Sequence, residues 1–422
     1  MACTFEALEP AKPRVRHNGP VPPAENVGAH VAALRKLRGM TGRELARRAY
    51  VSYSLVSKVE TGQAPASPAF VAAAARALRV DVTQLTGQPY RGTTPSSDRI
   101  HEAIPQVRRE LVAYALAPAE DDPAPRSLAQ LQGAVAEVSA WRHRSDLLHL
   151  GGALPGLLAE LRAATTTSEG HAQERVYGML AETYAAAGQL VWGLGYTDLW
   201  SIAVDRYGWA ASRSGDPLAV CVGDYLRCGD LLIAGDFPAA GRVLEPAFAR
   251  LEPELTHADA PTLSIWGSLH LKAALAAARA GNAATTWQHH AEAHTAAERI
   301  GTDRDDYRLC FGPTNVGIWS VGLAVELCDG ATAVTNAQRL HIPRRTQSER
   351  VGHHYIDLAR GYLWHDDRRG ALSCLLTARK VAPQQTRYHP MVRETLHALA
   401  RAERRATDSL RELATWVGIE DH

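Results

Sequence analysis

The sequence predicts an all-α protein in which a small N-terminal helical domain precedes a long array of helical hairpins. Apolar residues recur at helical spacing along most of the 422 residues, and almost no segment alternates in the manner of a β-strand. Capping residues divide the first part into short helices. Farther along the chain, glycine turns recur between alanine-rich segments, which is typical of stacked helical units.

Within residues 27–87, apolar spacing and capping residues predict five short helices. Apolar side chains recur every three or four positions between Val27 and Arg38, which indicates the first helix. Thr41 and Glu44 have the spacing of a capping box, so a second helix should begin after Thr41 with its free amide groups satisfied reciprocally. The later caps are Ser52 for the third helix, Ser67 followed by Pro68 for the fourth, and Asp81 for a last short turn.

The third of these helices has one apolar and one polar side. Val56 and Val59 are expected to point inward. The opposite side is polar and compact, and it carries Tyr53, Ser54, Ser57 and Lys58. Such a side suits contacts with the edges of bases in a DNA groove.

The segment from Thr41 to Gly62 resembles the helix-turn-helix of the Xre family, the phage-repressor and Cro type, and with its flanks the resemblance covers about one seventh of the chain. It implies a five-helix, lambda-repressor-like DNA-binding domain whose second helix of the pair enters the major groove. The residues that it places near DNA are Thr41, Arg43, Ser52, Tyr53, Ser54, Ser57 and Lys58. Two positions depart from the family: Gly42 stands where glutamine is common, and Tyr50 where the turn often has glycine.

Positive charge is concentrated in the same segment. Residues 27–87 hold nine basic and three acidic side chains, a net charge of +6, whereas the whole chain carries +1. Because residues 1–26 are balanced, residues 88–422 carry about −5. This distribution favours contact with DNA phosphates, although a small helical bundle that only packs or dimerises is the alternative.

Composition excludes several classes of protein. A hydrophobic content of 46% is ample for burial, so the chain is not disordered. We expect a cytoplasmic protein without membrane contact, because no apolar run approaches the length of a bilayer and the N-terminus lacks a signal-peptide core. Six scattered cysteines with no close pair are typical of a reducing compartment, and we expect them to be packing residues.

Breaker-rich segments suggest four parts. Residues 1–26 contain five prolines and are expected to form a mobile arm, and residues 27–87 form the DNA-binding domain. Residues 88–126 are predicted to be a linker with a helix. Residues 127–422 are predicted to be the helical region that binds a ligand and dimerises.

Recurring turns predict that this last region is an α-solenoid. The turns are expected at Ala187-Gly188, Ala234-Gly235-Asp236, Ala280-Gly281-Asn282, Cys328-Asp329-Gly330 and Asp366 to Gly370. The first four glycines are separated by 47, 46 and 49 residues, which indicates stacked helical hairpins. The unit from Tyr355 to Pro383 resembles a tetratricopeptide repeat, so we expect irregular, tetratricopeptide-like units.

No motif predicts catalysis, a resident metal or a cofactor. His289, His290 and His294 lie on one helix, but the glutamate of the zinc-protease motif stands two residues late, so a solvated helix face is the preferred interpretation. No phosphate loop, nucleophile elbow or paired-cysteine motif occurs. We therefore do not expect an enzyme.

Polar stripes on the repeat helices are the candidate ligand site. On the helix from Gln347 to Trp364, one face should pack while Arg350, His353, Asp357 and Arg360 lie on a free face. The residues predicted to line a groove are Trp266, His270, Asn315, Trp319, Arg350, His353 and Asp357. Equally well, such residues could lock neighbouring units together by salt bridges.

An Xre-type domain followed by tetratricopeptide-like units resembles the peptide-pheromone receptors of Gram-positive bacteria, the group of Rgg, PlcR and PrgX. The resemblance implies a homodimeric regulator that binds operator DNA and whose helical region binds an imported peptide. High alanine and arginine usage with few lysines favours a GC-rich genome such as an actinomycete's, where a small hormone-like effector is the alternative to a peptide. The alternatives are a DNA-bound adaptor whose repeats recruit another protein, and an enzyme with a DNA-binding domain.

Overall fold

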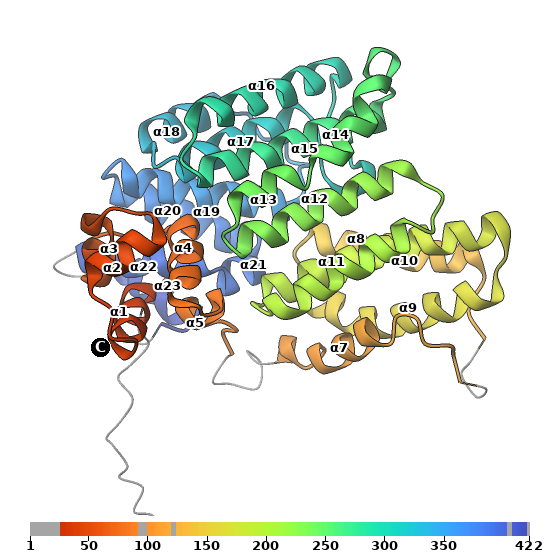
Figure 1. Ribbon diagram of the computed structural model, residues 1–422, viewed down its shortest axis with the longest axis horizontal. Coiled ribbons are helices and arrows are strands. Elements are labelled where there is room, and N and C mark those ends of the chain that lie inside the picture. The colour runs from red at the N-terminus through yellow and green to blue at the C-terminus, as the bar shows by residue number, and fades with distance from the viewer. Residues whose placement is uncertain (1–25, 92–98, 120–123, 403–406, 420–422) are drawn as a thin grey trace, which may run out of the picture.

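The computed structural model describes residues 26–91, 99–119, 124–402 and 407–419, and these ranges contain helices and no strand. The first five helices form one unit, which we call the head, and the later helices form a curved array, which we call the body (Figure 1). The prediction of an all-α chain with an N-terminal helical domain and helical repeats is confirmed. The predicted arm lies outside the described residues, apart from Asn26.

Each helix of the head begins at a side-chain cap. The helices are α1 (Val27–Leu37), α2 (Gly42–Ala49), α3 (Tyr53–Glu60), α4 (Pro68–Leu78) and α5 (Val82–Thr86), and their caps are Asn26, Thr41, Ser52, Ser67 and Asp81. Only half of the predicted capping box forms: Thr41 Oγ1 accepts from the Glu44 N–H at 3.1 Å, while the Glu44 carboxylate accepts from Arg48 at 2.5 Å. The apolar faces of the five helices share one core.

The body holds the remaining helices. In chain order they are η1 (Arg99–His101), α7 (Ile104–Val112), α8 (Leu128–His143), α9 (Leu147–Thr167), α10 (Gly170–Gly193), α11 (Thr197–Ala211), α12 (Pro217–Ile233), α13 (Phe237–Arg242), α14 (Glu245–Leu251), η2 (Glu252–His257), α15 (Ala260–Arg279), α16 (Ala283–Ile300), η3 (Asp306–Arg308), α17 (Pro313–Glu326), α18 (Gly330–Arg339), α19 (Ser348–Trp364), α20 (Arg368–Val381), α21 (Pro383–Tyr388), α22 (Pro390–Ala402) and α23 (Asp408–Val417). None of the helices described is long and apolar enough to cross a membrane.

One kind of three-residue turn joins the helices of six successive hairpins. The middle residue of each turn has a positive φ, and these residues are Ser145, Gly195, Gly235, Gly281, Cys328 and Asp366. The third residue is Asp or Asn at five of the turns and caps the next helix with its side chain. The repeated turn gives these hairpins a common geometry, as expected of repeated helical units.

One predicted turn was wrong. Gly188 lies inside α10, and the turn falls at Gly195 instead. The ring of Trp200 on α11 packs against Gly188, where an added Cβ would lie 3.1 Å from the nearest ring atom. A glycine that permits close helix packing therefore looks, in the sequence, like a glycine that ends a helix.

The last helices of the array return to the first hairpin. Gln384 Oε1 on α21 accepts from the Leu147 N–H at 2.6 Å and from the Leu148 N–H at 3.2 Å. Ser145 in the first turn donates to Gln385 Oε1 at 3.0 Å. The array thus nearly closes on itself, and α22 lies beside the head (Figure 1).

Candidate functional site

The turn between α2 and α3 forms without a glycine. Tyr50 ends α2 in the left-handed conformation, with φ 56° and ψ 39°, and its backbone N–H bonds to the carbonyl oxygens of Ala46 and Arg47. Its side chain is 86% exposed, so the ring does not compete for space in the head. Glycine is the usual residue at such a helix end, so the left-handed tyrosine has a conformational cost of about 1 kcal/mol.

The polar side of α3 faces outward, as the spacing predicts. Tyr53, Ser54 and Lys58 are exposed, and Ser57 is half-buried. The hydroxyl of Ser52 accepts from the Leu55 N–H at 3.1 Å, so its first role is to cap α3. Because Val56 and Val59 are buried, the helix is fixed in rotation and its polar side stays in solvent.

Arg43 and Thr41 flank this side from the start of α2. The Arg43 guanidinium lies 5.8 Å from the ring centroid of Tyr53. That ring also lies against Gly42, where an added Cβ would be 2.9 Å from Tyr53 Cε2. The Tyr53 ring therefore takes the space that a side chain at position 42 would need, which accounts for the glycine there.

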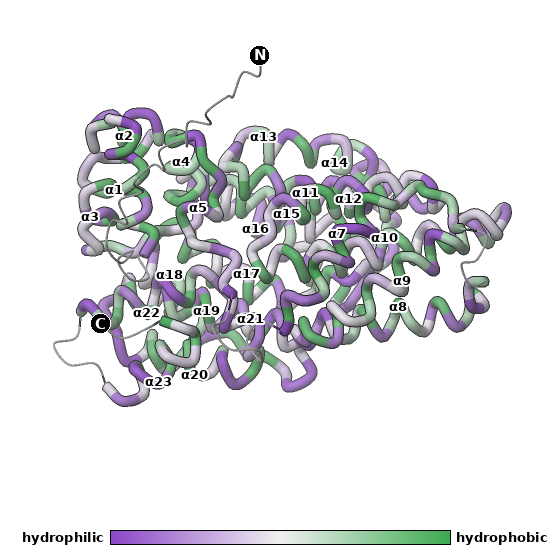
Figure 2. Tube along the Cα trace, turned by 90° about the horizontal axis from the view of Figure 1, so that it is seen from below, coloured by the Kyte–Doolittle hydropathy of each residue, from purple (hydrophilic) through white to green (hydrophobic). Residues whose placement is uncertain are grey.

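Pairing inside the head leaves part of its positive charge free. Glu60 binds Arg35 with both oxygens, at 2.6 and 2.7 Å, and Glu44 binds Arg48. Among the described residues, no carboxylate pairs with the exposed Arg43, Arg47 or Lys58. Figure 2 shows α1, α2 and α3 together at one end of the molecule, with hydrophilic stretches along α2. Free cations beside a polar helix are what binding to DNA phosphates requires.

Residues 26–86 match a family model described as a helix-turn-helix domain. The head is a helix-turn-helix domain. The match spans the head alone, and it supports a DNA-binding regulator. Comparison of the chain with curated proteins and with solved structures gave no match.

Hydrogen bonds between side chains and backbone groups hold the helix-turn-helix domain against the body. The buried carboxylate of Glu394 on α22 accepts from the N–H groups of Val27, at 3.1 Å, and Ala66, at 3.3 Å. Arg401 donates to the Gly62 carbonyl at 2.8 Å, and Arg76 donates to the Gly235 carbonyl at 3.1 Å. The contacts leave the polar side of α3 uncovered.

A cavity of about 180 Å³ lies at this junction. The head contributes residues of α4 and α5 to its wall, and the body contributes the ends of α10, α12 and α15 together with the start of α19. Most of the lining is apolar, with Trp192, Leu232 and Met391 among the larger side chains. The sequence analysis did not find this cavity, because its wall is assembled from segments far apart in the chain.

The residues predicted to line a ligand groove occupy separate places in the body. On α15, the His270 ring centroid lies 4.7 Å from those of Trp266 and Phe248, and His270 Nδ1 is 2.9 Å from His289 Nδ1. On α17, Asn315 is buried and its Oδ1 has no hydrogen-bond partner among the described residues. Trp319 packs beside it on the apolar cluster of Phe311.

The stripe on α19 is not a free face, contrary to our expectation. Arg350 pairs with Glu349, and Asp357 accepts from Arg360 at 3.0 Å. Arg360 also binds Glu326 on α17. Of the seven predicted groove residues, His353 alone lines the cavity at the head–body junction.

The histidines of α16 do not converge on a common point. His289 faces His270, His290 Nε2 lies 3.1 Å from the Val316 carbonyl oxygen, and His294 lies 3.6 Å from Glu298. His294 is exposed, as expected of a solvated face, but His289 and His290 are half-buried. The helix therefore packs through two of its three histidines.

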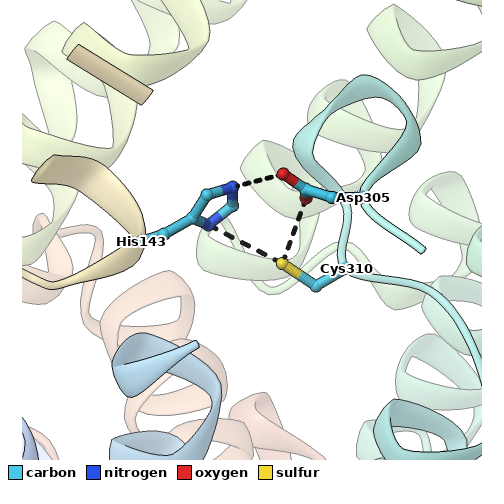
Figure 3. Close-up of side chains that lie close together, drawn as sticks. All are labelled: His143, Asp305 and Cys310. Carbon is cyan, nitrogen blue, oxygen red and sulfur yellow. Dashed lines mark hydrogen bonds and ion pairs between the residues drawn. The ribbon is translucent and has the colours of Figure 1, made fainter. Parts of the chain in front are cut away.

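His143, Asp305 and Cys310 form the one group of metal-type donors in the part of the chain that the structure describes (Figure 3). His143 Nε2 lies 3.0 Å from Asp305 Oδ2, and Cys310 Sγ lies 3.6 Å from His143 Nδ1 and 3.4 Å from Asp305 Oδ1. Arg308 also binds Asp305, at 3.2 Å, and burial raises the pKa of the Cys310 thiol. A neutral thiol and a competing guanidinium disfavour a cation, so we interpret the group as a link between α8 and the loop before α17.

Buried neutral histidines should make stability depend on pH. Burial lowers the pKa of His354 and His397 to about 4, from an ordinary value of 6.5. Between these pH values the unfolded chain binds protons that the folded chain does not, so the free energy of unfolding falls as pH decreases from 6.5 to 4. Each histidine contributes up to about 1.4 kcal/mol per pH unit.

Urea denaturation at several pH values measures this slope. We expect the double variant His354→Gln, His397→Gln to have a flatter slope than the parent, and the exposed control His171→Gln to keep the parental one. An identical slope in the double variant and the parent would show that these two histidines are not held neutral.

Proposed function

We propose that this chain is a sequence-specific, Xre-type regulator of transcription whose body binds an effector and thereby changes DNA binding. One observation carries the proposal: the helix-turn-helix domain is docked on the body, while the polar side of α3 faces outward at the end of the molecule (Figure 1). In this arrangement the head can bind DNA, and a change in the body can alter that binding. In this proposal α3 contacts base edges, and the start of α2 contacts phosphates.

The proposal includes a homodimer. One small domain contacts too little DNA for tight binding, and two heads on half-sites one helical turn apart, or a multiple of it, would correct this. The operator would then have two-fold symmetry. The body, rather than the head, supplies the dimer contact, because the resemblance to the pheromone receptors implies dimerisation through the helical region.

Alanine at Tyr53 or Ser57 should reduce the discrimination between operator and random DNA. Loss of a good base contact costs about 1 to 3 kcal/mol, which lowers the specificity ratio by about 5-fold to 150-fold. Lys58→Ala should in addition weaken binding to random DNA, because it removes a positive charge from the surface that faces DNA. An operator is first selected from a random duplex pool, and competition gel shifts then give the ratio.

A matched control is Lys380→Ala, because Lys380 is exposed on α20 in the body. It should bind operator and random DNA like the parent. Equal specificity ratios for the parent, Tyr53→Ala and Ser57→Ala would remove α3 as the recognition helix.

The cavity favours an effector over the alternative of a protein-recruiting adaptor. An adaptor needs an exposed surface for its partner, whereas this feature is a concave and mostly apolar space that both the head and the body line. A ligand there would contact both parts at once.

A further inference from the structure

We infer that the effector is a compact, neutral and mainly apolar small molecule with one hydrogen-bonding end, and that it binds in the cavity between α4, α5 and the body. This inference rests on the proposed function, since it names the site and ligand class for the effector. It differs from the groove predicted along the repeat helices and from an extended peptide as the ligand.

The size of the cavity limits the ligand. Its volume of about 180 Å³ slightly exceeds the roughly 150 Å³ of an engineered cavity that binds benzene. Drug-sized ligands occupy pockets of about 300 to 1,000 Å³. A single substituted ring therefore fills this space, whereas most of an extended peptide would lie outside it.

The walls determine that the ligand is mostly apolar. The body contributes Trp192, Leu232, Ile233 and Met391, and the head contributes Val71. The Trp192 indole is 37% exposed. Its ring centroid lies 6.0 Å from that of His353 and 6.4 Å from that of His389, so the three rings line one side of the cavity together. An apolar ring would remove this aromatic surface from water, which stabilises the complex.

Part of the cavity lining is polar, which accounts for the hydrogen-bonding group of the ligand. His389 Nδ1 accepts from the Met391 N–H at 3.2 Å, so the proton is on Nε2, which can donate to a ligand oxygen. Burial, with His353 nearby, keeps the pKa of His389 well below its ordinary value, so the ring is neutral. The Glu349 carboxylate already pairs with Arg350 and lies 3.3 Å from His353 Nε2. Arg279, which also lines the cavity, pairs with Glu326 at 3.1 Å. A charged ligand would therefore meet no free countercharge there, and a hydroxyl or carbonyl group suits the site.

The position of the cavity couples the ligand to DNA binding. Pro68, Val71 and Ala72 on α4 and Val82 and Thr86 on α5 belong to the head, and they line the same space as the body residues. If the head moves away from the body, the cavity loses one wall. The ligand therefore prefers the docked arrangement, and by linkage it shifts the population of heads toward that arrangement.

The test uses 4-fluorophenol, a single ring with one hydroxyl, and follows its binding by fluorine NMR. Ile233→Trp fills the cavity from the body side, and Val82→Phe fills it from the head side. Leu148→Trp is the matched control, because Leu148 is 38% exposed and does not line the cavity. We expect the parent and the control to bind the probe, and both filled variants to bind it at least about tenfold more weakly.

Hydrogen exchange tests the coupling in the full chain. The probe should slow exchange of the amides of α4 and α5 in the parent and leave them unchanged in Ile233→Trp. Circular dichroism shows whether each filled variant folds. If one of them does not fold, probe binding by the other variant is the test. Equal binding to the parent and to a folded filled variant, or no binding to the parent, would overturn the inference.

The failure of the inference and that of the proposed function are distinguishable. A parent that binds its operator specifically but not 4-fluorophenol contradicts only the ligand class and site. A parent that binds the probe but shows no preference for any DNA sequence contradicts the proposed function.

Discussion

Replacing Glu326 with glutamine should lower the free energy of unfolding by about 3 kcal/mol. Glu326 is the centre of a buried ion network, in which it accepts from Arg279 at 3.1 Å and from Arg360 at 3.0 Å. Burial alone would raise the pKa of Glu326, but the two guanidinium groups hold this pKa below its ordinary value. The neutral amide would leave Arg360, which is 7% exposed, without half of its countercharge.

The cost should be at the lower end of the range for a broken buried pair, because Asp357 still binds Arg360. Glu412→Gln is the control, since Glu412 pairs with Arg379 at 2.9 Å on the surface, where such pairs contribute less than about 1 kcal/mol. Urea denaturation of both variants measures the difference. Equal losses in the two variants would show that the network of Glu326 does not stabilise the body.

The head was predictable because its signals are local. A Ser, Thr, Asn or Asp cap can satisfy the first amide groups of a helix wherever it stands, so Thr41, Ser52 and Ser67 define helix starts in the sequence. The outward side of α3 follows from the two valines on its inward side. Both arguments need only a few neighbouring residues, and the structure agrees with both.

The hairpin turns were only partly predictable. Gly235 and Gly281 have the positive φ of the turn, and glycine adopts it freely, so these turns were found. Ser145 and Asp366 adopt the same conformation without being glycine. The turn at Asp366 was found through Gly370 close by, whereas the turn at Ser145 has no such glycine and was missed, although Asp146 caps the next helix.

The ligand cavity could not be predicted from helical stripes, because residues of one stripe on α19 have different surroundings in the structure. His353 reaches the cavity, whereas Arg350 and Asp357 are bound in ion pairs. Arg360, which binds Asp357, also binds Glu326 on another helix. Spacing along one helix shows which residues share a face, but not what covers that face. Only the packing of distant helices determines this.

Gly28→Ala should disrupt the helix-turn-helix domain, with an expected cost of about 2 to 3 kcal/mol. Gly28 is buried on α1 where this helix crosses α3. A Cβ added there would lie 2.8 Å from the carbonyl carbon of Val59 and even closer to its oxygen. The clash is with backbone atoms, which cannot change rotamer as a side chain can, so α3 would have to move. The polar side of α3 would then lose its orientation, and operator binding should be lost.

Gly133→Ala on α8 is the matched control, because nothing lies within 4 Å of a Cβ at that position. In that open site, alanine should stabilise the helix by about 0.5 to 1 kcal/mol. Gel shifts with the selected operator report DNA binding, and hydrogen exchange of the α3 amides reports the local stability of the head. Since Gly28 contacts no residue predicted to bind DNA, lost binding together with faster exchange in α3 would show that the close approach of α1 and α3 sets the recognition surface. Parental exchange and binding in Gly28→Ala would show instead that α3 is positioned by its other neighbours.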